Sequence, residues 1–569
     1  MNIRLSAVAG LLLHCTLHVF GQSPARFDII IDELLPDPTP AIALPNAEFI
    51  ELKNNSAVPW DLNGWKISNH SSTSIIKRSV ILQPDSFLIV CSTSAVDLYL
   101  PFGAVLGISS FPSLGNEGDT ISIQSPEGVI VHAIAYKKSF YQNDVKSNGG
   151  WSLEMIDTKN PCAFDNWKAS ENMKGGTPGT INSVDGNHPD EYAPALLRTY
   201  TIDSVTVVAI FNEPLDSNSA STIQNYQIDQ GVGSPISANS KPPIFTEVEL
   251  KLPVAMHPNL VYQLTTTNIS DCAGNTEGNG QIKIGLPTAA DTTDIVINEI
   301  LFNPKTNGYD YVELYNRSNK IVDLKELFFA NKSSSGSFDK IASLSNRPVL
   351  FFPGNYFVMT ENSESIIQNY LVKHPENIVE LTSMPSLPDD HGNIYLLSNS
   401  GNTIDALEYD HTWHFGLVNN EEGVALERIN YNEATQIKNN WTSASSTSGY
   451  GTPTYANSQF AINESSGIDF SVTPKTFSPN NDGYNDYCFI NYNLSEPGYS
   501  ANITIFDAAG MEVRYLARNA ILGTNGNFRW DGLNDAQQKL PMGIYVVLAE
   551  IFNLNGHVKI VKKAIVLGK

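Results

Sequence analysis

The chain has 569 residues and a formal net charge of −24 at pH 7. This acidity argues against nucleic acid as a partner, because phosphate backbones bind clustered basic side chains and Lys and Arg form no dense run here. The length supports about four domains of ordinary size. Short apolar runs bounded by Gly, Pro, Asn, Asp and Ser fill almost the whole chain. They are typical of strands joined by turns and predict an all-β fold.

The first residues have the features of a secretory signal. Arg4 precedes an apolar run over residues 5–19. This pattern predicts a signal peptide over residues 1–21, cleaved before Gln22. A lipoprotein anchor at Cys15 is the alternative interpretation. We expect no transmembrane segment elsewhere, because no other stretch is long and apolar enough to cross a bilayer.

Two long segments, 25–185 and 292–460, carry the same sequence features in the same order. The shared positions are the acid-bearing opening strands at 31–35 and 297–301 and the Gly-Thr-Pro closing segments at 176–178 and 451–453. Their separation of roughly 270 residues is far above the period of solenoid repeats. The sequence therefore predicts two whole domains of one kind.

Two further segments also consist of short predicted strands separated by turns. They span residues 193–287, between the two copies, and residues 468–569, after the second copy. Strands this short and regular predict small sandwiches. Taken together, the chain is expected to form four tandem β-sandwich domains of the immunoglobulin-like kind after a cleaved signal peptide.

The two long segments resemble lamin tail domains, in the bacterial secreted form of that family. The residues that carry the resemblance are Asp32-Glu33-Leu34-Leu35, Asn298-Glu299-Ile300-Leu301, Glu51-Leu52-Lys53-Asn54, Glu313-Leu314-Tyr315-Asn316 and Asp61-Leu62-Asn63-Gly64-Trp65, together with the Gly-Thr-Pro closings. The second segment lacks a Gly-Trp pair after Asp323. The family implies a β-sandwich used as a binding or adhesive module, without catalytic activity.

The other two segments resemble two further families. Residues 193–287 are similar to bacterial Ig-like domains through 211–215 and 269–275. Residues 468–569 resemble the gliding-motility-associated C-terminal domain, the type B sorting domain of the type IX secretion system. That resemblance rests on Phe477, Pro479, Asn481, Asp482, Gly483, Asn485, Asp486, Trp530, Gly532, Gly543 and Tyr545. It implies the type IX secretion machinery as a partner, and a secreted or outer cell-surface location reached through the periplasm.

Four cysteines remain after the predicted cleavage: Cys91, Cys162, Cys272 and Cys488. They are spread over the predicted domains without close spacing, so a disulfide framework is not expected. Only Cys91 and Cys162 share a predicted domain. A Cys91–Cys162 bridge and two buried thiols are the alternatives there.

The sequence contains no recognisable catalytic motif, so we expect no enzyme and no cofactor. Asp32, Glu33 and Glu51 could form an acid–base pair across strands, but outward-facing or turn-bonding roles are the simpler interpretation. His411 and His414 could meet a metal, or could belong to an aromatic loop. The tryptophans Trp60, Trp65, Trp151, Trp167 and Trp441 could stack on sugars or fill sandwich cores.

Asn480, Asp482 and Asp486 concentrate oxygen atoms around Gly483, in a loop that calcium would accept. Their spacing differs from that of an EF-hand, and a turn rich in Asn and Asp side-chain bonds is the alternative.

The sequence leads to one hypothesis and one alternative. The hypothesis is a secreted or cell-surface, non-catalytic binding or adhesion protein exported by a type IX system, with polysaccharide or a surface protein as the extracellular ligand. The alternative is an accessory protein that binds polysaccharide or nucleic acid for a separate degradative enzyme.

Overall fold

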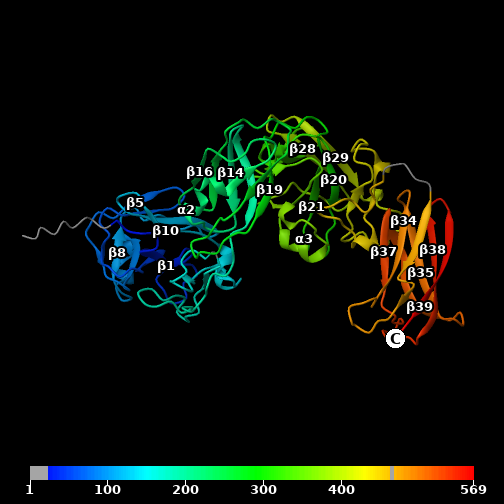
Figure 1. Ribbon diagram of the computed structural model, residues 1–569, viewed down its shortest axis with the longest axis horizontal. Helices are drawn as coiled ribbons and strands as arrows, with labels where there is room; N and C mark the ends of the chain where they lie inside the picture. The colour runs from blue at the N-terminus through cyan, green and yellow to red at the C-terminus, as the bar shows by residue number, and fades with distance from the viewer. Residues whose placement is uncertain (1–22, 164, 462–466) are drawn as a thin grey trace, which may run out of the picture.

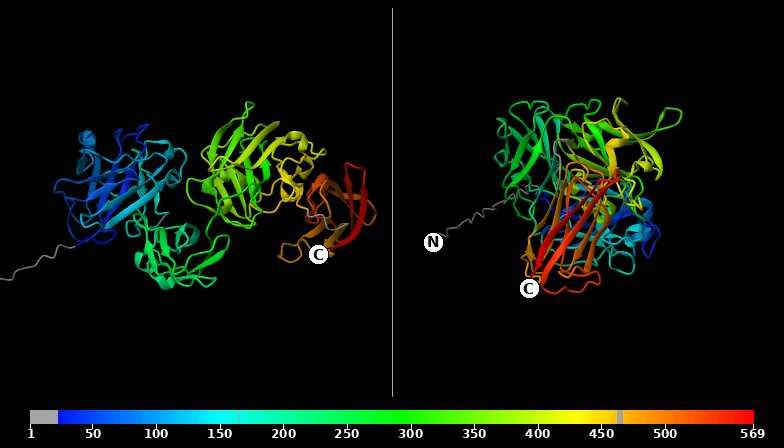
Figure 2. Two further views of the ribbon diagram at one scale, coloured as in Figure 1. Left: turned by 90° about the horizontal axis from the view of Figure 1, so that it is seen from above. Right: turned by 90° about the vertical axis from the view of Figure 1, so that its right-hand side faces the viewer.

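A computed structural model describes residues 23–163, 165–461 and 467–569. The predicted signal peptide, residues 1–21, lies outside the described residues. Figure 1 shows four β units that follow one another in chain order, and Figure 2 shows that the middle unit lies to one side of its neighbours when seen from above. In the described part of the chain, no helix is both long and apolar enough to cross a membrane.

The first copy is a sandwich of a six-stranded and a four-stranded sheet. The six-stranded sheet has the order β12 (Trp167–Ala169), β11 (Leu153–Met155), β1 (Ile29–Leu35), β2 (Phe49–Asn54), β7 (Phe87–Ser92) and β8 (Val105–Ile108). The four-stranded sheet has the order β10 (Ile130–Lys137), β9 (Gly118–Gln124), β4 (Lys66–Ser68) and β5 (Thr73–Ile75). A ribbon of β3 (Trp60–Asp61) and β6 (Ile81–Leu82), and the helix α1 (Val96–Tyr99), complete the unit.

The second copy repeats this arrangement strand for strand. Its six-stranded sheet has the order β31 (Trp441–Ser443), β30 (Leu426–Arg428), β20 (Ile295–Leu301), β21 (Tyr311–Asn316), β26 (Tyr356–Thr360) and β27 (Ile378–Glu380). Its second sheet has the order β29 (Thr403–Asp410), β28 (His391–Ser398), β23 (Leu327–Lys332) and β24 (Phe338–Ser343). The ribbon is β22 (Val322–Asp323) with β25 (Leu350–Phe351), and the helix is α3 (Ser363–Asn369).

The central strand of each copy is buried along its whole length. One face of β1 packs in the core between the two sheets, through side chains such as Ile31 and Leu34. The other face is covered by a smaller cluster that includes Phe49 and Tyr99. A strand covered on both faces is apolar almost throughout rather than alternating, and this is why the opening strands have continuous apolar sequences.

Both central strands also carry the same irregularity. The register shifts between Ile31 and Glu33 in the first copy and between Ile297 and Glu299 in the second. Such a bulge leaves one residue unpaired in the ladder, so its backbone must find another partner.

The middle and C-terminal units are smaller sandwiches. The middle unit joins the sheet β13 (Leu196–Asp203), β14 (Thr206–Phe211), β17 (Glu247–Lys251), β16 (Ser237–Ser240) to the sheet β15 (Tyr226–Ile228), β18 (Tyr262–Thr266), β19 (Gly280–Ile284), with the helix α2 (Ser217–Ala220). The C-terminal unit joins β32 (Ile468–Thr473), β34 (Cys488–Leu494), β37 (Asn525–Trp530) to β33 (Thr476–Phe477), β39 (Val558–Leu567), β38 (Gly543–Asn553), β35 (Tyr499–Phe506), β36 (Glu512–Leu522). The predicted all-β class is confirmed.

A disulfide joins the first copy to the middle unit, between Cys162 and Cys272, whose Cα atoms are 6.4 Å apart. The prediction that Cys162 pairs with Cys91 or stays a buried thiol is therefore wrong. Cys91 lies on β7 and is buried in the cluster around Tyr99, where burial raises its pKa to about 11. Cys162 lies in the loop between β11 and β12, which meets the middle unit.

The second copy contacts both of its neighbours. On the side of the middle unit, Arg198 donates from Nη1 to the carbonyl of Pro348 at 2.8 Å, and Val261 packs on Ile321 and Phe352. The other side meets the C-terminal unit.

The contact with the C-terminal unit is made by backbone and buried amide groups. The amide Nε2 of Gln459 donates to the carbonyls of Ser443 at 2.9 Å and Leu522 at 3.1 Å. The backbone N–H of Thr524 donates to the carbonyl of Ser458 at 2.8 Å. Gln459 is fully buried, so the C-terminal unit docks against the second copy at this point.

Candidate functional site

Three glutamates lie side by side across the six-stranded sheet of each copy, and we call each set a glutamate row. The first copy's row is Glu51, Glu33 and Glu154, and the second copy's row is Glu313, Glu299 and Glu427. In each row the central residue pairs directly with the other two across the strand ladder. All six side chains are 0% exposed.

In the first copy the closing Gly-Thr-Pro segment covers the row and donates hydrogen bonds to it. The backbone N–H of Thr177 donates to Glu33 at 2.9 Å, and the Thr177 hydroxyl donates to Glu154 at 2.8 Å. The backbone N–H of Gly179 donates to Glu51 at 2.5 Å. The expectation that Asp32, Glu33 and Glu51 face outward is wrong, since all three are buried, and the turn-bonding interpretation is confirmed for Glu33 and Glu51.

The second copy has the same set of bonds. Thr452 donates from its backbone N–H to Glu299 at 2.9 Å and from its hydroxyl to Glu427 at 2.8 Å. The backbone N–H of Thr454 donates to Glu313 at 2.5 Å. Each of these bonds satisfies a donor that would otherwise be buried without a partner, at a cost of about 1–3 kcal/mol. The glutamate row therefore holds the closing segment against the sheet in both copies.

Burial is the main cause that raises the pKa of Glu33 and Glu299, and the neighbouring glutamate adds to the increase. Burial likewise raises the pKa of Glu51 and Glu313. A general acid or base must reach the proton it transfers on a substrate. Carboxyl groups with no exposed surface, beneath a closing segment, are arranged to hold backbone groups instead.

Beside each bulge, the residue that precedes the unpaired one donates its backbone N–H to a buried side chain on the second sheet. In the first copy, Ile31 donates to Nδ1 of His132 at 2.9 Å. The other ring nitrogen, Nε2, lies 3.2 Å from the carbonyl of Pro161. Since Nδ1 accepts, Nε2 must carry the proton, and the ring is neutral. Burial lowers the pKa of His132 to about 4.

The first copy is expected to lose stability in acid because of His132. Its folded pKa lies below the ordinary value of about 6.5, so between about pH 6.5 and 4 the unfolded chain binds a proton that the folded chain does not. The free energy of unfolding should fall by about 3 kcal/mol across this window. Hydrogen exchange of the β1 amides, corrected for intrinsic rates, measures it. In His132→Asn, which keeps an acceptor but cannot titrate, this decrease should be absent; an equal decrease in the variant would contradict the assignment.

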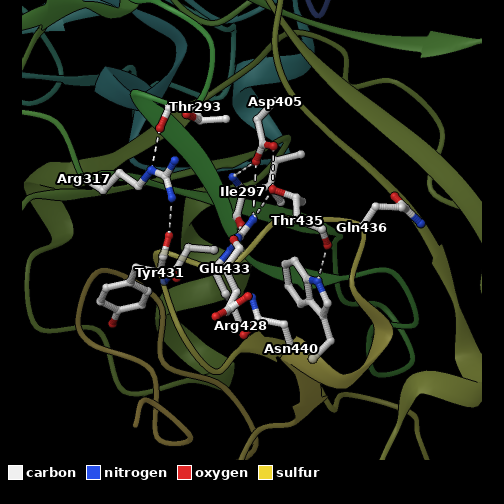
Figure 3. Close-up of polar contacts among 12 residues, drawn as sticks. Thr293, Ile297, Arg317, Asp405, Arg428, Tyr431, Glu433, Thr435, Gln436 and Asn440 are labelled. Carbon is white, nitrogen blue, oxygen red and sulfur yellow. Dashed lines mark hydrogen bonds and ion pairs between the residues drawn. The ribbon is translucent and has the colours of Figure 1, made fainter. Parts of the chain in front are cut away.

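In the second copy an ion pair occupies the same place (Figure 3). Ile297 donates its backbone N–H to Asp405 at 2.8 Å, and Asp405 is joined by the guanidinium of Arg428 at 3.4 Å. Arg428 stands where the first copy has Met155, one residue after the outer glutamate of the row. Both side chains are buried.

Arg428 donates three further hydrogen bonds. Nε donates to the carbonyl of Ile297 at 2.8 Å, and Nη1 donates to the carbonyl of Glu433 at 2.9 Å. Thr435 accepts from Nη2 at 2.5 Å and donates to Asp405 at 2.5 Å. Burial lowers the pKa of Arg428 to about 10, and Asp405 opposes that decrease. Through these bonds, Arg428, Asp405 and Thr435 connect β20, β29 and the loop after β30. Their role is therefore structural.

Sequence reasoning missed this pair. The available signal was the single charged residue Arg428 at a position where the other copy has an apolar side chain.

His411 and His414 face different partners. His411 Nδ1 lies 3.3 Å from a carboxylate oxygen of Glu421, and His414 Nδ1 lies 2.8 Å from the hydroxyl of Ser443. His414 also packs on the ring of Phe302, at a centroid distance of 5.5 Å. Its pKa is lowered to about 4, mainly by burial. These contacts fit the aromatic-loop interpretation.

The tryptophans lie mainly in the cores. Trp65, Trp167 and Trp441 are buried, while Trp60 and Trp151 are half-buried and pack against the first copy's core. Stacking on a sugar needs an open ring face, and a buried ring has none.

In the C-terminal unit, the predicted sorting residues form two groups. The first is a buried aromatic set: Phe477 packs on Trp530 at a centroid distance of 5.2 Å, and Trp530 packs on Tyr545 at 5.4 Å. Gly532 has a positive φ of 75°, and an added Cβ would meet Pro479 at 3.0 Å. Glycine is therefore required there by both backbone and space. Gly543 begins β38.

The second group is the exposed loop 480–486, which is held by its own side chains. Asp486 accepts from the backbone N–H groups of Asn481 at 2.6 Å and Gly483 at 2.9 Å. Asp482 accepts from the backbone N–H of Tyr484 at 2.8 Å. Asn481, Gly483 and Asn485 have positive φ, as such turns require. Calcium at Asn480, Asp482 and Asp486 stays a prediction.

Comparison with protein families matches the Lamin Tail Domain to residues 22–138 and 288–411, and the CHU_C Type IX secretion signal domain to residues 471–566. Neither match includes the middle unit, whose likeness to bacterial Ig-like domains stays a prediction. No curated protein sequence matches the chain.

Several solved structures match part or most of the chain at low sequence identity. The N-terminal part of the bacterial S-layer protein SbsC is 16% identical, with 28% of this chain and 44% of that chain covered and a TM-score of 0.16. A DUF4876 family protein from Bacteroides thetaiotaomicron is 12% identical, with 35% and 81% covered and a TM-score of 0.18. A tetra-tandem repeat from the extending region of a large adhesion protein is 10% identical, with 95% and 98% covered and a TM-score of 0.12.

These TM-scores are too low to carry a structural argument, and the chain spans about half the length of the SbsC structures that it matches, 44% and 54%. The two Lamin Tail Domain matches fall on the two repeated sandwiches, and the CHU_C match falls on the C-terminal unit. The chain therefore carries two lamin tail domain regions and a C-terminal type IX secretion signal domain, and it is a type IX secreted protein.

Proposed function

We propose that this protein is a non-catalytic surface protein whose two lamin tail domains bind another protein outside the cell. One observation carries the proposal: both domains expose a pair of aliphatic side chains at the same place. We call this pair the apolar corner. In the first domain it is Leu98 and Leu100, which are 51% and 56% exposed, and in the second it is Ile367 and Leu371, which are 48% and 60% exposed.

The apolar corner has the same support in both domains. In each domain the corner lies at a short helix that comes after the strand beside the two central strands. That helix is α1, after β7, in the first domain and α3, after β26, in the second. A buried tyrosine fixes each corner: Tyr99 donates its hydroxyl to the carbonyl of Ala47 at 2.5 Å, and Tyr370 donates to that of Gly423 at 3.0 Å. The exposed aliphatic groups are thus presented on a fixed base.

The chemistry of the corner favours a protein partner over polysaccharide. Aliphatic side chains gain from burial against other apolar surface, whereas sugars are bound by aromatic faces and hydrogen bonds. The buried tryptophans therefore give no support to the accessory role on polysaccharide, and the net charge of −24 opposes a role on nucleic acid. The buried glutamate rows give no support to catalysis.

The proposal predicts that polar substitution of both corners removes cell binding. Labelled mature protein should bind saturably to the surface of host cells, and the variant with Ser at positions 98, 100, 367 and 371 should bind at least tenfold more weakly. A matched control places Ser at the exposed Ile75, Ile81 and Ile341, away from both corners. Equal binding by the corner variant, or binding only to insoluble cellulose or chitin, would refute the proposal.

A further inference from the structure

Three carboxylates meet where the first lamin tail domain joins the middle unit. Asp190 lies in the segment that links the two, Glu213 follows β14, and Asp271 follows β18. One carboxylate oxygen from each lies within 4.8 Å of the other two. Across residues 23–163, 165–461 and 467–569, this is the one group of at least three His, Cys, Asp or Glu side chains close enough to share a metal ion.

Three carboxylate oxygens in this cluster, two on Glu213 and one on Asp190, lack hydrogen-bond partners. Glu213 is 1% exposed, and neither of its carboxylate oxygens accepts a hydrogen bond. Asp190 Oδ2 is also buried without a partner. A buried polar atom without a hydrogen bond costs about 1–3 kcal/mol, and more when it is charged. Three such oxygens within one group of carboxylates point to a missing positive group.

Asp271 is held in place for this arrangement. It is 2% exposed, and its Oδ1 accepts from the backbone N–H groups of Gly274 at 2.7 Å and Asn275 at 2.9 Å. The side-chain amide of Asn275 donates to Asp271 Oδ2 at 2.8 Å and to the carbonyl of Asp190 at 3.0 Å. The linker and the loop are thus already connected beside the cluster.

No Lys or Arg in the described part of the chain forms an ion pair with any of the three carboxylates. His188 is a basic group close enough to act on Asp190, and its Nε2 lies 3.2 Å from a carboxylate oxygen of Asp165. Burial, with the charges of Asp190 and Asp271 next, raises the pKa of Glu213 to about 7. The protein alone supplies little positive charge to this site.

We propose that Asp190, Glu213 and Asp271 bind a calcium ion that fixes the linker to the middle unit. Calcium takes oxygen ligands at about 2.3–2.6 Å, so ligands on opposite sides of the ion lie about 5 Å apart. Oxygens within 4.8 Å of one another fit that sphere. Zinc prefers nitrogen and sulfur ligands, which this set lacks, and magnesium requires shorter bonds and retains its waters.

The ion would act beside the disulfide. Asp271 directly precedes Cys272, which is bonded to Cys162 of the first domain. The disulfide joins the two units covalently, and the calcium ion would hold the linker that runs between them. This inference does not depend on the proposed adhesion function.

The test is a calcium titration of the mature chain after treatment with a chelator, followed by calorimetry and by hydrogen exchange of residues 186–195. We expect one ion per chain at this site and at least a fivefold slowing of exchange in that segment. Glu213→Gln, which has the same shape, and Asp190→Asn, in the partly exposed linker, should each weaken binding at least tenfold. Magnesium at the same concentration should leave exchange unchanged.

Asp482→Asn is the matched control, because it removes a carboxylate from the C-terminal loop and leaves the junction intact. It should bind calcium at the junction as the unmodified chain does. Calcium binding that is lost in Asp482→Asn but kept in both Glu213→Gln and Asp190→Asn would overturn the proposal, as would a titration without heat or any change in exchange.

Discussion

Arg428→Met is expected to lower the free energy of unfolding of the second lamin tail domain by about 3–5 kcal/mol, the usual cost of removing one partner from a buried ion pair. Asp405 would remain as a buried charge with its main counter-charge removed. Methionine is the residue that the first domain carries at this place, as Met155, so packing volume is a minor part of the effect. Hydrogen exchange of the β20 amides in the intact chain measures the loss.

The double variant Arg428→Met, Asp405→Asn is the control. It keeps an oxygen that accepts from the Ile297 N–H but removes both charges, as in the first domain, where neutral His132 is the acceptor. Replacing a whole buried pair by neutral groups is often close to neutral in stability. The double variant should therefore regain more than half of the loss. If it is as unstable as the single variant, the guanidinium acts through its carbonyl bonds rather than its charge.

Glu299→Ala is expected to lower the free energy of unfolding of the same domain by about 2–6 kcal/mol. It leaves the backbone N–H of Thr452 and the hydroxyl of Tyr311 buried without an acceptor, at about 1–3 kcal/mol each. The closing segment should detach first, so faster hydrogen exchange in residues 451–458 is the measurement. Unchanged exchange there would show that the segment does not need the glutamate row.

Glu299→Gln separates the charge from the hydrogen bonds. Because the folded pKa of Glu299 is raised, the folded domain binds a proton more tightly than the unfolded chain. The contribution of Glu299 to the free energy of unfolding is fully present below about pH 4.5. It is lost as the pH rises through the folded pKa of Glu299. Glutamine cannot ionise, so the variant should lose less stability than the unmodified domain between pH 5 and 9. Identical pH profiles would contradict this explanation.

Much of the fold follows from local sequence patterns. The duplication was visible because each copy repeats an acid-bearing strand and a Gly-Thr-Pro closing, and the same sheet order and the same bulge follow from it. The turn around Gly483 follows from nearby residues alone, because Asp482 and Asp486 accept bonds from backbone N–H groups of the same loop. Local geometry of this kind is contained in a short stretch of chain.

The features that the sequence did not predict depend on contacts between distant segments. The burial of Glu33 is decided by Thr177, 144 residues away, so the strand alone could not show that both its faces are covered. The Cys162–Cys272 pairing depends on how two units dock, and the expectation that bridges stay within one domain pointed elsewhere. The Asp190, Glu213 and Asp271 cluster likewise comes from three separate segments.

The Cys162–Cys272 bond also determines how the chain carries mechanical load. A pull between the two ends passes directly from the loop after β11 to the loop before β19, so residues 163–271 bear no tension while the bond is intact. Six of the seven middle-unit strands described above, β13 to β18, lie in that shielded segment. Reduction of the bond would release a 110-residue length, which spans about 360–400 Å when fully extended. For a protein exported from the cell, the bond limits how far the chain stretches under force.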